Sequence, residues 1–205
     1  IKINFSYRIK NTWLLMMSEF FVATYNFNKS GTNERNASIT LKSRSLATVL
    51  TQAFDYDLPS ELLIAPENYY INFYRFIASA KKSIDIYQTG LSDEHTCDII
   101  SVLSERVKIR VITARNVFGE TAMDTATKCC IKRLTGSKNI ELRFLNEPFY
   151  VHAKIVLNDS NDLDARILLG SSNFAKESFF QSREVGLIFT KFEISQEMQT
   201  IFNQD

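Results

Sequence analysis

The sequence lacks several features that would assign it directly to a class of protein. It contains no apolar run of the roughly 20 residues that a membrane-spanning helix needs. Its net charge is only +1, and none of its basic stretches is dense enough to form a tail, so composition provides no general attraction for nucleic acid. The opening residues, Ile1-Lys2-Ile3-Asn4, are not those of a signal peptide. Because no methionine begins the chain, we expect part of the natural N-terminus to be absent, and export stays an open alternative.

Cysteine and histidine are also scarce. The three cysteines, Cys97, Cys129 and Cys130, are an odd set with two adjacent members, so they predict neither a disulfide framework nor a zinc site. Free thiols indicate a reducing compartment, which favours a cytoplasmic location, and no targeting signal identifies another. Of the two histidines, we expect His95, in a predicted helix, to be solvent-exposed. Near the other, His152, no histidine, cysteine and carboxylate cluster has the spacing of metal ligands, so we expect no metal and no cofactor.

The remaining composition is that of a folded domain. Of 205 residues, 45% are hydrophobic, which is enough for one large domain or for one and a half small ones. Predicted helices alternate with predicted strands along the chain, and this alternation is typical of a layered α/β fold. The helices are predicted over residues 66–81, 92–105, 120–134 and 194–202, and the strands over residues 83–88, 107–113, 140–145 and 184–190. We expect Ser92 to cap the second of these helices.

Two apolar segments near the C-terminus, residues 150–159 and 165–173, predict a β-hairpin. The small polar residues between them, 160–164, favour a turn. The first segment carries His152 and Lys154, and the second carries Ser171 and Asn173. The members of each pair are two positions apart, and alternate residues of a strand point to the same face. We therefore expect each pair to lie on one face of the hairpin.

The register of the hairpin decides whether the two pairs face each other. We expect Asp159 to pair with Arg166, which places Lys154 opposite Ser171 and the histidine opposite the asparagine. A slip of one residue would break that arrangement. In the expected register the cluster combines an imidazole that titrates near neutral pH, a fixed cation and two neutral hydrogen-bond donors. This combination predicts a binding site for an anion, with a reactive group in it.

Three short motifs in fixed order resemble the catalytic signature of the phospholipase D superfamily: His152-x-Lys154-x-x-x-x-Asp159, Gly170-Ser171-x-Asn173 and Arg183-Glu184-Val185-Gly186. The resemblance extends from about Pro59 to Asp205. It implies the fold of that family, an α/β layered sandwich in which helices flank a mixed β-sheet. It also implies the family's reaction, metal-independent hydrolysis or transfer at a phosphodiester. Within the motifs, Asp159 and Gly170 are implied to be structural.

The resemblance implies a catalytic or substrate-binding role for the other motif residues. In the family, the histidine attacks phosphorus and forms a phosphohistidine, and this role falls on His152. The lysine and the asparagine bind the phosphate oxygens, which are the implied roles of Lys154 and Asn173, with Ser171 supporting the phosphate. The glutamate orients the histidine, which is the implied role of Glu184. Covalent catalysis of this kind splits one difficult displacement into two easier ones.

An internal repeat accounts for the first part of the chain. Two stretches correspond: Ala23-Thr24-Tyr25-Asn26-Phe27 with Gly170-Ser171-Ser172-Asn173-Phe174, and Arg35 with Arg183. From there the spacing stays in step to the end of both copies. We therefore expect residues 1–58 to be the degenerate C-terminal part of a first repeat, and residues 59–205 to be the complete catalytic repeat. Asn36 stands where the second copy has Glu184, so the first copy has lost its chemistry.

No second catalytic histidine is present in the sequence, whereas two-copy members of the family bring two histidines to one site. Three alternatives stay open: two chains pair through His152 as a homodimer, the protein is a weakened or inactive pseudoenzyme that binds phosphate, or an upstream piece is missing. As substrate we favour a phospholipid, because of the two-copy ancestry and the near-neutral charge. A nuclease that acts as a homodimer is the second reading, and a phosphate-binding scaffold is the third.

Overall fold

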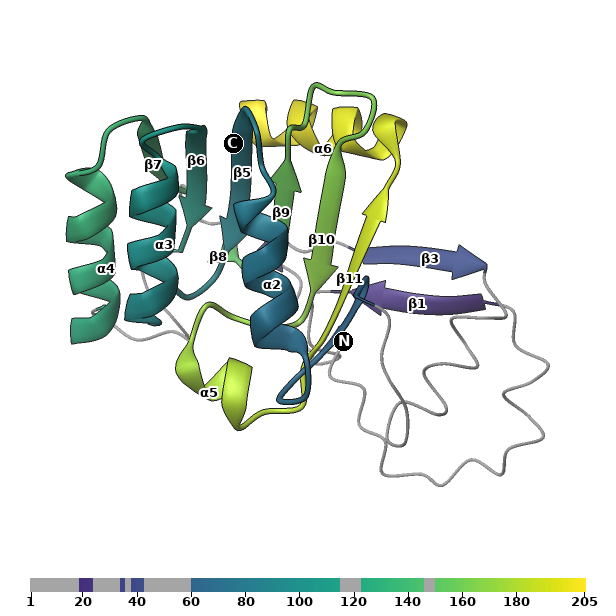
Figure 1. Cartoon of the computed structure of the whole chain (residues 1–205), viewed down its shortest axis with the longest axis horizontal. Coiled ribbons are helices and arrows are strands. Elements are labelled where there is room, and N and C mark those ends of the chain that lie inside the picture. Colours follow the sequence, from purple (N-terminus) through teal and green to yellow (C-terminus); the bar gives the residue numbers. More distant parts are fainter. Residues whose placement is uncertain (1–18, 24–33, 36–37, 43–59, 115–122, 146–149) are drawn as a thin grey trace.

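A seven-stranded mixed β-sheet forms the centre of the protein (Figure 1). The computed structural model describes residues 19–23, 34–35, 38–42, 60–114, 123–145 and 150–205. Within them the elements run in this order: β1 (Glu19–Ala23), β2 (Glu34–Arg35), β3 (Ser38–Lys42), β4 (Leu62–Ile64), α2 (Tyr69–Ala78), β5 (Ser83–Gln88), α3 (Glu94–Leu103), β6 (Lys108–Thr113), α4 (Thr125–Thr135), β7 (Ile140–Phe144), β8 (Tyr150–Val151), β9 (Ile155–Asn158), β10 (Arg166–Gly170), α5 (Lys176–Phe180), β11 (Val185–Thr190) and α6 (Phe192–Gln204).

The strands of the central sheet lie in the order β4-β11-β10-β9-β5-β6-β7. β5, β6 and β7 are parallel and are connected through α3 and α4, because parallel neighbours need a crossover connection. β9 pairs antiparallel with β5 and with β10, and β11 pairs antiparallel with β10 and β4. The structure thus confirms the layered α/β fold with a mixed sheet that the sequence predicted.

Helices cover both faces of the sheet and create two cores. On one face, α2, α3, α4 and α5 bury side chains such as Phe73 and Phe179. On the other face, α6 buries Phe202. Successive strand residues go to opposite cores, as Ile86 and Tyr87 of β5 do. The central strands are therefore apolar on both faces, which is why they occur in the sequence as short apolar runs.

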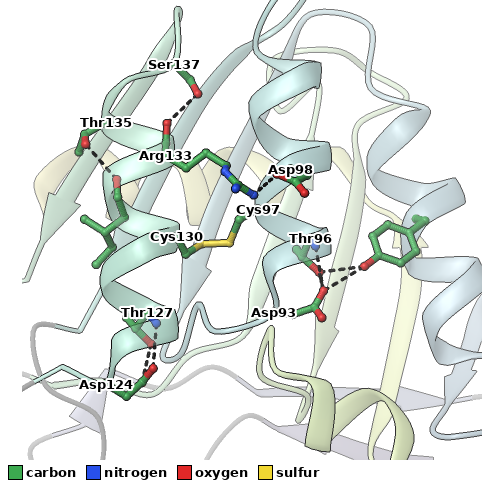
Figure 2. The surroundings of a disulfide bond; sticks show 12 residues. Asp93, Thr96, Cys97, Asp98, Asp124, Thr127, Cys130, Arg133, Thr135 and Ser137 are labelled. Carbon is green, nitrogen blue, oxygen red and sulfur yellow. Dashed lines mark hydrogen bonds and ion pairs between the residues drawn. A yellow bond between two sulfur atoms is a disulfide. The ribbon is translucent and has the colours of Figure 1, made fainter.

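The helix boundaries differ from those expected, and the caps explain the difference. α3 begins after Asp93 rather than Ser92, because the Asp93 carboxylate accepts a hydrogen bond from the Thr96 amide (2.8 Å; Figure 2). Asp124 caps α4 in the same way, and residues 120–122 of the expected helix lie outside the described residues. The short elements β4 and α5 were not expected, since so few residues carry little pattern. In the described part of the chain, no helix is both long and apolar enough to cross a bilayer.

The expected hairpin is present as β9 and β10, but its register differs by one residue from the expected one. Arg166 pairs with Asn158 rather than with Asp159. Asp159 has left the strand and has a positive φ of 54°. At the other end of the hairpin, β10 stops at Gly170. The predicted pairing of the two motif segments across the hairpin is therefore wrong.

Hydrogen bonds to a distant turn explain why Asp159 leaves the strand. Its carboxylate accepts from the amides of Lys81 (3.0 Å), Lys82 (2.6 Å) and Ser83 (3.0 Å), at the start of β5. Its own amide donates to the Ser83 carbonyl (2.9 Å). Hydrogen bonds to an ionised carboxylate are stronger than neutral ones, and aspartate tolerates the left-handed region better than most residues. Asp159 thus ties the end of β9 to the start of β5.

The N-terminal strands form two small additional sheets. β1 pairs antiparallel with β3, with Glu19 opposite Lys42, and β1 contacts β10 of the central sheet. β2 pairs in parallel with β8, with Glu34 opposite Tyr150. Residues 24–27 and Asn36, on which part of the internal repeat depends, lie outside the described residues.

A disulfide between Cys97 and Cys130 joins α3 to α4 (Figure 2). Both cysteines are buried, and their Cα atoms lie 5.7 Å apart although 33 positions separate them in the sequence. Cys129 is a free, exposed thiol. The expectation that the cysteines form no disulfide is therefore wrong, because helix packing joins residues that no spacing rule connects. Since disulfides persist in oxidising compartments, the thiol-based argument for a cytoplasmic location is lost as well.

We expect the disulfide to contribute substantially to stability. Loss of such a cross-link typically costs about 2–4 kcal/mol, mainly because the unfolded chain gains conformational freedom. The double replacement Cys97→Ala/Cys130→Ala should lower the free energy of unfolding, measured by urea titration without reductant, by that order. The matched control Cys129→Ala should change it by less than about 0.5 kcal/mol. Three alkylatable thiols in the unfolded, non-reduced wild type would contradict the disulfide.

Candidate active site

Four strand ends meet at one edge of the central sheet. The residues that follow β5 and β10 lie there, together with those that precede β9 and β11. This arrangement follows from the antiparallel pairing of β9 with β5 and β10, and of β11 with β10. His152 and Lys154 precede β9, Ser171 and Asn173 follow β10, and Glu184 precedes β11. The topology therefore collects at this edge the five residues for which the sequence predicted a catalytic or binding role.

His152 and Lys154 lie between β8 and β9 and are both buried, with 6% and 5% of their surfaces exposed. Val151 and Ile155 belong to the core beneath α6, so by alternation the histidine and the lysine lie on the other face. The Lys154 ammonium donates to the Thr89 hydroxyl (2.9 Å) and to the His152 carbonyl (2.7 Å). A buried ammonium is costly unless it is hydrogen-bonded. These bonds hold the cation next to the histidine.

Thr89 and Gly90, directly after β5, connect Lys154 to Asn173. A Cβ on Gly90 would lie 3.8 Å from Asn173 Cβ, and the Gly90 carbonyl accepts from the Phe174 amide (3.2 Å). Among the described residues, Asn173 Oδ1 is buried and has no hydrogen-bond partner. A ligand that donates a hydrogen bond would remove the cost of this unpaired oxygen. Sequence reasoning missed Thr89 and Gly90, although their place after a parallel strand is a signal of a binding site.

Ser171 follows β10 directly and is bonded to the start of β11. Its hydroxyl donates to Glu184 Oε2 and accepts from the Val185 amide (3.2 Å). Its amide donates to the Val185 carbonyl (3.0 Å). Glu184 is buried, with 6% of its surface exposed. These contacts join Glu184 to Ser171, and the role of Glu184 in orienting His152 stays a prediction.

Tyr69, the first residue of α2, is a buried neighbour of this pair that sequence reasoning missed. Burial first, and then the negative charge of Glu184, raise the pKa of the Tyr69 hydroxyl above its ordinary value. The hydroxyl therefore stays protonated at neutral pH and can donate a hydrogen bond. In the sequence, Tyr69 belongs to an aromatic run with helical spacing, and nothing distinguishes it there from a core residue such as Phe73.

Gly170 and Gly186 lie opposite each other in the β10–β11 pair. A Cβ on Gly170 would lie 2.7 Å from the Val185 carbonyl oxygen and 2.9 Å from Gly186 Cα. A Cβ on Gly186 would lie 3.0 Å from the Tyr69 hydroxyl. Backbone atoms cannot move aside as a flexible side chain can, so residue 170 has room only for glycine. The two glycines allow β10, β11 and Tyr69 to pack together beside Glu184.

Three other residues lie outside this group of five. Asp159 is at the opposite end of β9, where its contacts are with backbone amides. Lys176 is exposed on α5. His95 is exposed on α3, as expected, and its ring stacks on Tyr70 with 6.3 Å between centroids. Within the described ranges, no group of three or more histidine, cysteine and carboxylate residues has an arrangement that could hold a metal ion.

Comparison with known families identifies one match. Residues 73–205 match the family described as "Cardiolipin synthase, PLD-like domain", which is well over half of the chain. No curated protein sequence matches the chain significantly.

Solved structures share the fold at low sequence identity. NucT from Helicobacter pylori is 19% identical with a TM-score of 0.58, and the match covers 70% of this chain and 92% of that one. Nuc from Salmonella typhimurium, described as a phospholipase D family member, is 20% identical with a TM-score of 0.60, covering 70% and 90%. Phosphatidylserine synthase from Haemophilus influenzae is 14% identical with a TM-score of 0.65, covering 92% of this chain but 59% of that one.

The close approach of β10 and β11 yields a stability prediction. Gly170→Ala should destabilise the protein by about 1–3 kcal/mol, because the added methyl group meets backbone atoms on the neighbouring strand. The matched control is Gly136→Ala at the end of α4, where φ is −84° and the nearest atom would be 3.5 Å away. That control should be neutral or stabilising by up to about 1 kcal/mol. Equal thermal midpoints for the two variants would contradict the packing described here.

Proposed function

The chain belongs to the phospholipase D superfamily, and we propose that it is a phosphodiester hydrolase or transferase that acts through a phosphohistidine on His152. The observation that carries the proposal is the gathering of buried ionisable residues at one sheet edge. His152, Lys154 and Glu184 are 6%, 5% and 6% exposed, although each belongs to a residue type that is costly to bury in charged form. Burial of several such groups together is typical of functional sites.

In the proposed reaction, an imidazole nitrogen of His152 attacks phosphorus. A phosphorus–nitrogen bond forms while the bond to the leaving alcohol breaks, and water or a second alcohol then reverses the exchange. Negative charge grows on the phosphoryl oxygens during both steps. The Lys154 ammonium and the Asn173 amide would stabilise that charge, with the Ser171 hydroxyl supporting the phosphate. Glu184 would hold the imidazole in the tautomer that attacks.

We also propose that residues 1–58 are the degenerate end of a first repeat, and the strand registers support this. In β1 and β3, Ala23 lies opposite Ser38. In β10 and β11, Gly170 lies opposite Gly186. Ala23 corresponds to Gly170 in the internal repeat, and Ser38 is as far from Arg35 as Gly186 is from Arg183. The two hairpins therefore have the same register, as two copies of one domain would.

A phospholipid is the substrate that we favour. The phosphatidylserine synthase structure matches 92% of the chain, which must include part of the first 58 residues, whereas the Nuc structure matches 70%. The near-neutral net charge supports the same choice. A nuclease acting as a homodimer is the alternative, and an inactive phosphate-binding protein is a further one. Nucleic-acid binding would weaken steeply as salt is added, because bound counterions are released.

An experiment that mixes wild-type chains with His152→Ala chains distinguishes a monomeric enzyme from a homodimer with a shared active site. In a homodimer with one site shared by two His152 residues, an excess of His152→Ala chains would lower wild-type activity beyond simple dilution. We expect no such loss, because the first repeat already lies in the chain and contacts β10. Sedimentation of the same samples reports the oligomeric state directly.

The central test is to trap the intermediate. Rapid quenching during turnover of a phosphodiester with a p-nitrophenol leaving group should give an acid-labile adduct on His152, detected by mass measurement of the peptide. His152→Ala should form none. We expect the adduct and turnover to persist in EDTA, since no step in this mechanism uses a metal ion. Turnover that is lost on chelation and restored by added metal would refute the phosphohistidine mechanism.

The anion-binding roles predict the effect of two further variants. Lys154→Ala and Asn173→Ala should each lower kcat by about a hundredfold to a thousandfold, as removal of one charge-stabilising donor typically does. Their thermal midpoints should stay close to that of the wild type, which separates a lost role in the reaction from a lost fold. Lys176→Ala is the matched control, because Lys176 is an exposed cation three positions after Asn173. A variant that unfolds would show that its residue is structural.

A further inference from the structure

Gln88, the last residue of β5, is a buried polar side chain that the proposed reaction does not use. Only 1% of its surface is exposed. By strand alternation it lies on the same face of the sheet as Ile86, whose side chain belongs to the core beneath α2, α3, α4 and α5. Burial of a carboxamide in such surroundings is costly unless it is hydrogen-bonded. The partners of Gln88 therefore indicate what this side chain does.

Both ends of the Gln88 carboxamide bind backbone groups close to the candidate active site. Gln88 Oε1 accepts a hydrogen bond from the Thr89 amide (2.9 Å), and Gln88 Nε2 donates to the Ser172 carbonyl (3.3 Å). A backbone amide can only donate and a backbone carbonyl can only accept, so these two partners fix the orientation of the carboxamide. Neither a carboxylate nor an apolar side chain of the same shape could make both bonds.

The first partner, Thr89, leads to the cation of the site. Its hydroxyl accepts from the Lys154 ammonium (2.9 Å). Its carbonyl accepts from the Thr113 hydroxyl of β6 (3.5 Å), while its amide donates to Gln88. The backbone of Thr89 is thus held on both sides, which limits the positions of its hydroxyl and of the ammonium group bound to it.

The second partner, Ser172, directly precedes the anion-binding Asn173. The Ser172 carbonyl is bonded to the side chain of Gln88 at the end of β5. The Phe174 amide, on the other side of Asn173, donates to the carbonyl of Gly90 (3.2 Å). The backbone of Asn173 is therefore tied to the end of β5 both before and after the residue.

We propose that Gln88 is a positioning residue of the active site, which fixes the Lys154 ammonium and the Asn173 amide relative to each other. This inference rests on the proposed function. The two anion-binding groups come from different segments of the motif, and Gln88 is bonded to the backbone next to Asn173 and to the backbone of the residue that holds Lys154. In this role Gln88 touches neither the substrate nor the reacting atoms. A misplacement of about 1 Å in an active site can cost about a hundredfold in rate.

The test replaces Gln88 with methionine, which has a similar shape but makes neither bond. Gln88→Met should lower kcat for the p-nitrophenyl phosphodiester by about tenfold to a hundredfold. KM should change less, because the misplaced groups are needed most in the transition state. Gln196→Met is the matched control, since Gln196 Nε2 on α6 donates to the Ser160 carbonyl (2.8 Å), beyond the far end of β9. This control loses the same kind of bond and should keep the wild-type kcat.

Double variants show whether Gln88 acts through the two anion-binding groups. In the Lys154→Ala background, and in the Asn173→Ala background, Gln88→Met should lower kcat by only about twofold to fivefold, because one of the groups that it positions is already absent. A defect that merely loosens the fold would lower kcat by the same factor in every background. If Gln88→Met does not fold, Gln88→Glu, which keeps the acceptor for the Thr89 amide, is measured in the same way with Asn173→Ala.

The outcomes separate this inference from the proposed function. An unchanged kcat in Gln88→Met would overturn the role of Gln88, as would an equal loss in Gln196→Met or equal losses in all backgrounds. A loss that is specific to Gln88 and shrinks in the double variants supports it. A wild type that forms no His152 adduct and shows no turnover would instead refute the proposed function, and the positioning role would fail with it.

Discussion

The end of β10 can lie against the start of β11 because residues 170 and 186 carry no side chain. The chain leaves β10 after Gly170, next to Val185. The amide and the hydroxyl of Ser171 therefore both form hydrogen bonds with the backbone of Val185. The same hydroxyl reaches the carboxylate of Glu184, and the ring of a buried tyrosine from α2 fills the space over the glycines. One side of the candidate site therefore depends on a single close approach between two strands.

The other side depends on the length of β9. Lys154 is at the start of this strand and Asp159 directly follows its end, so the four residues between them are β9 itself. The number of residues between Lys154 and Asp159 in the motif thus equals the length of β9. Asp159 anchors the far end to the turn before β5, and Lys154 meets Thr89 at the other end of β5. One polar side chain therefore contacts the neighbouring strand or its flanking residues at each end of β9.

The N-terminal strands contribute backbone pairing and contacts to the rest of the domain. The β1–β3 hairpin has the register of β10 and β11, and β2 pairs with the strand that leads to His152. A pairing of this kind uses main-chain groups and therefore survives changes of side chain that abolish a catalytic motif. As the proposed degenerate repeat, this segment would still support the strand that leads to His152.

The sequence by itself determined the fold class, the main helices and strands, and which residues form the motif, because periodicity, caps and fixed-order motifs are properties of neighbouring residues. It did not determine the hairpin register, which depends on Asp159 binding amides 76–78 residues away. Nor did it identify the Cys97–Cys130 disulfide, or Thr89 as the partner of Lys154. Each of these joins groups that are distant in the chain. Only the packing of strands and helices decides which of the many such pairs meet.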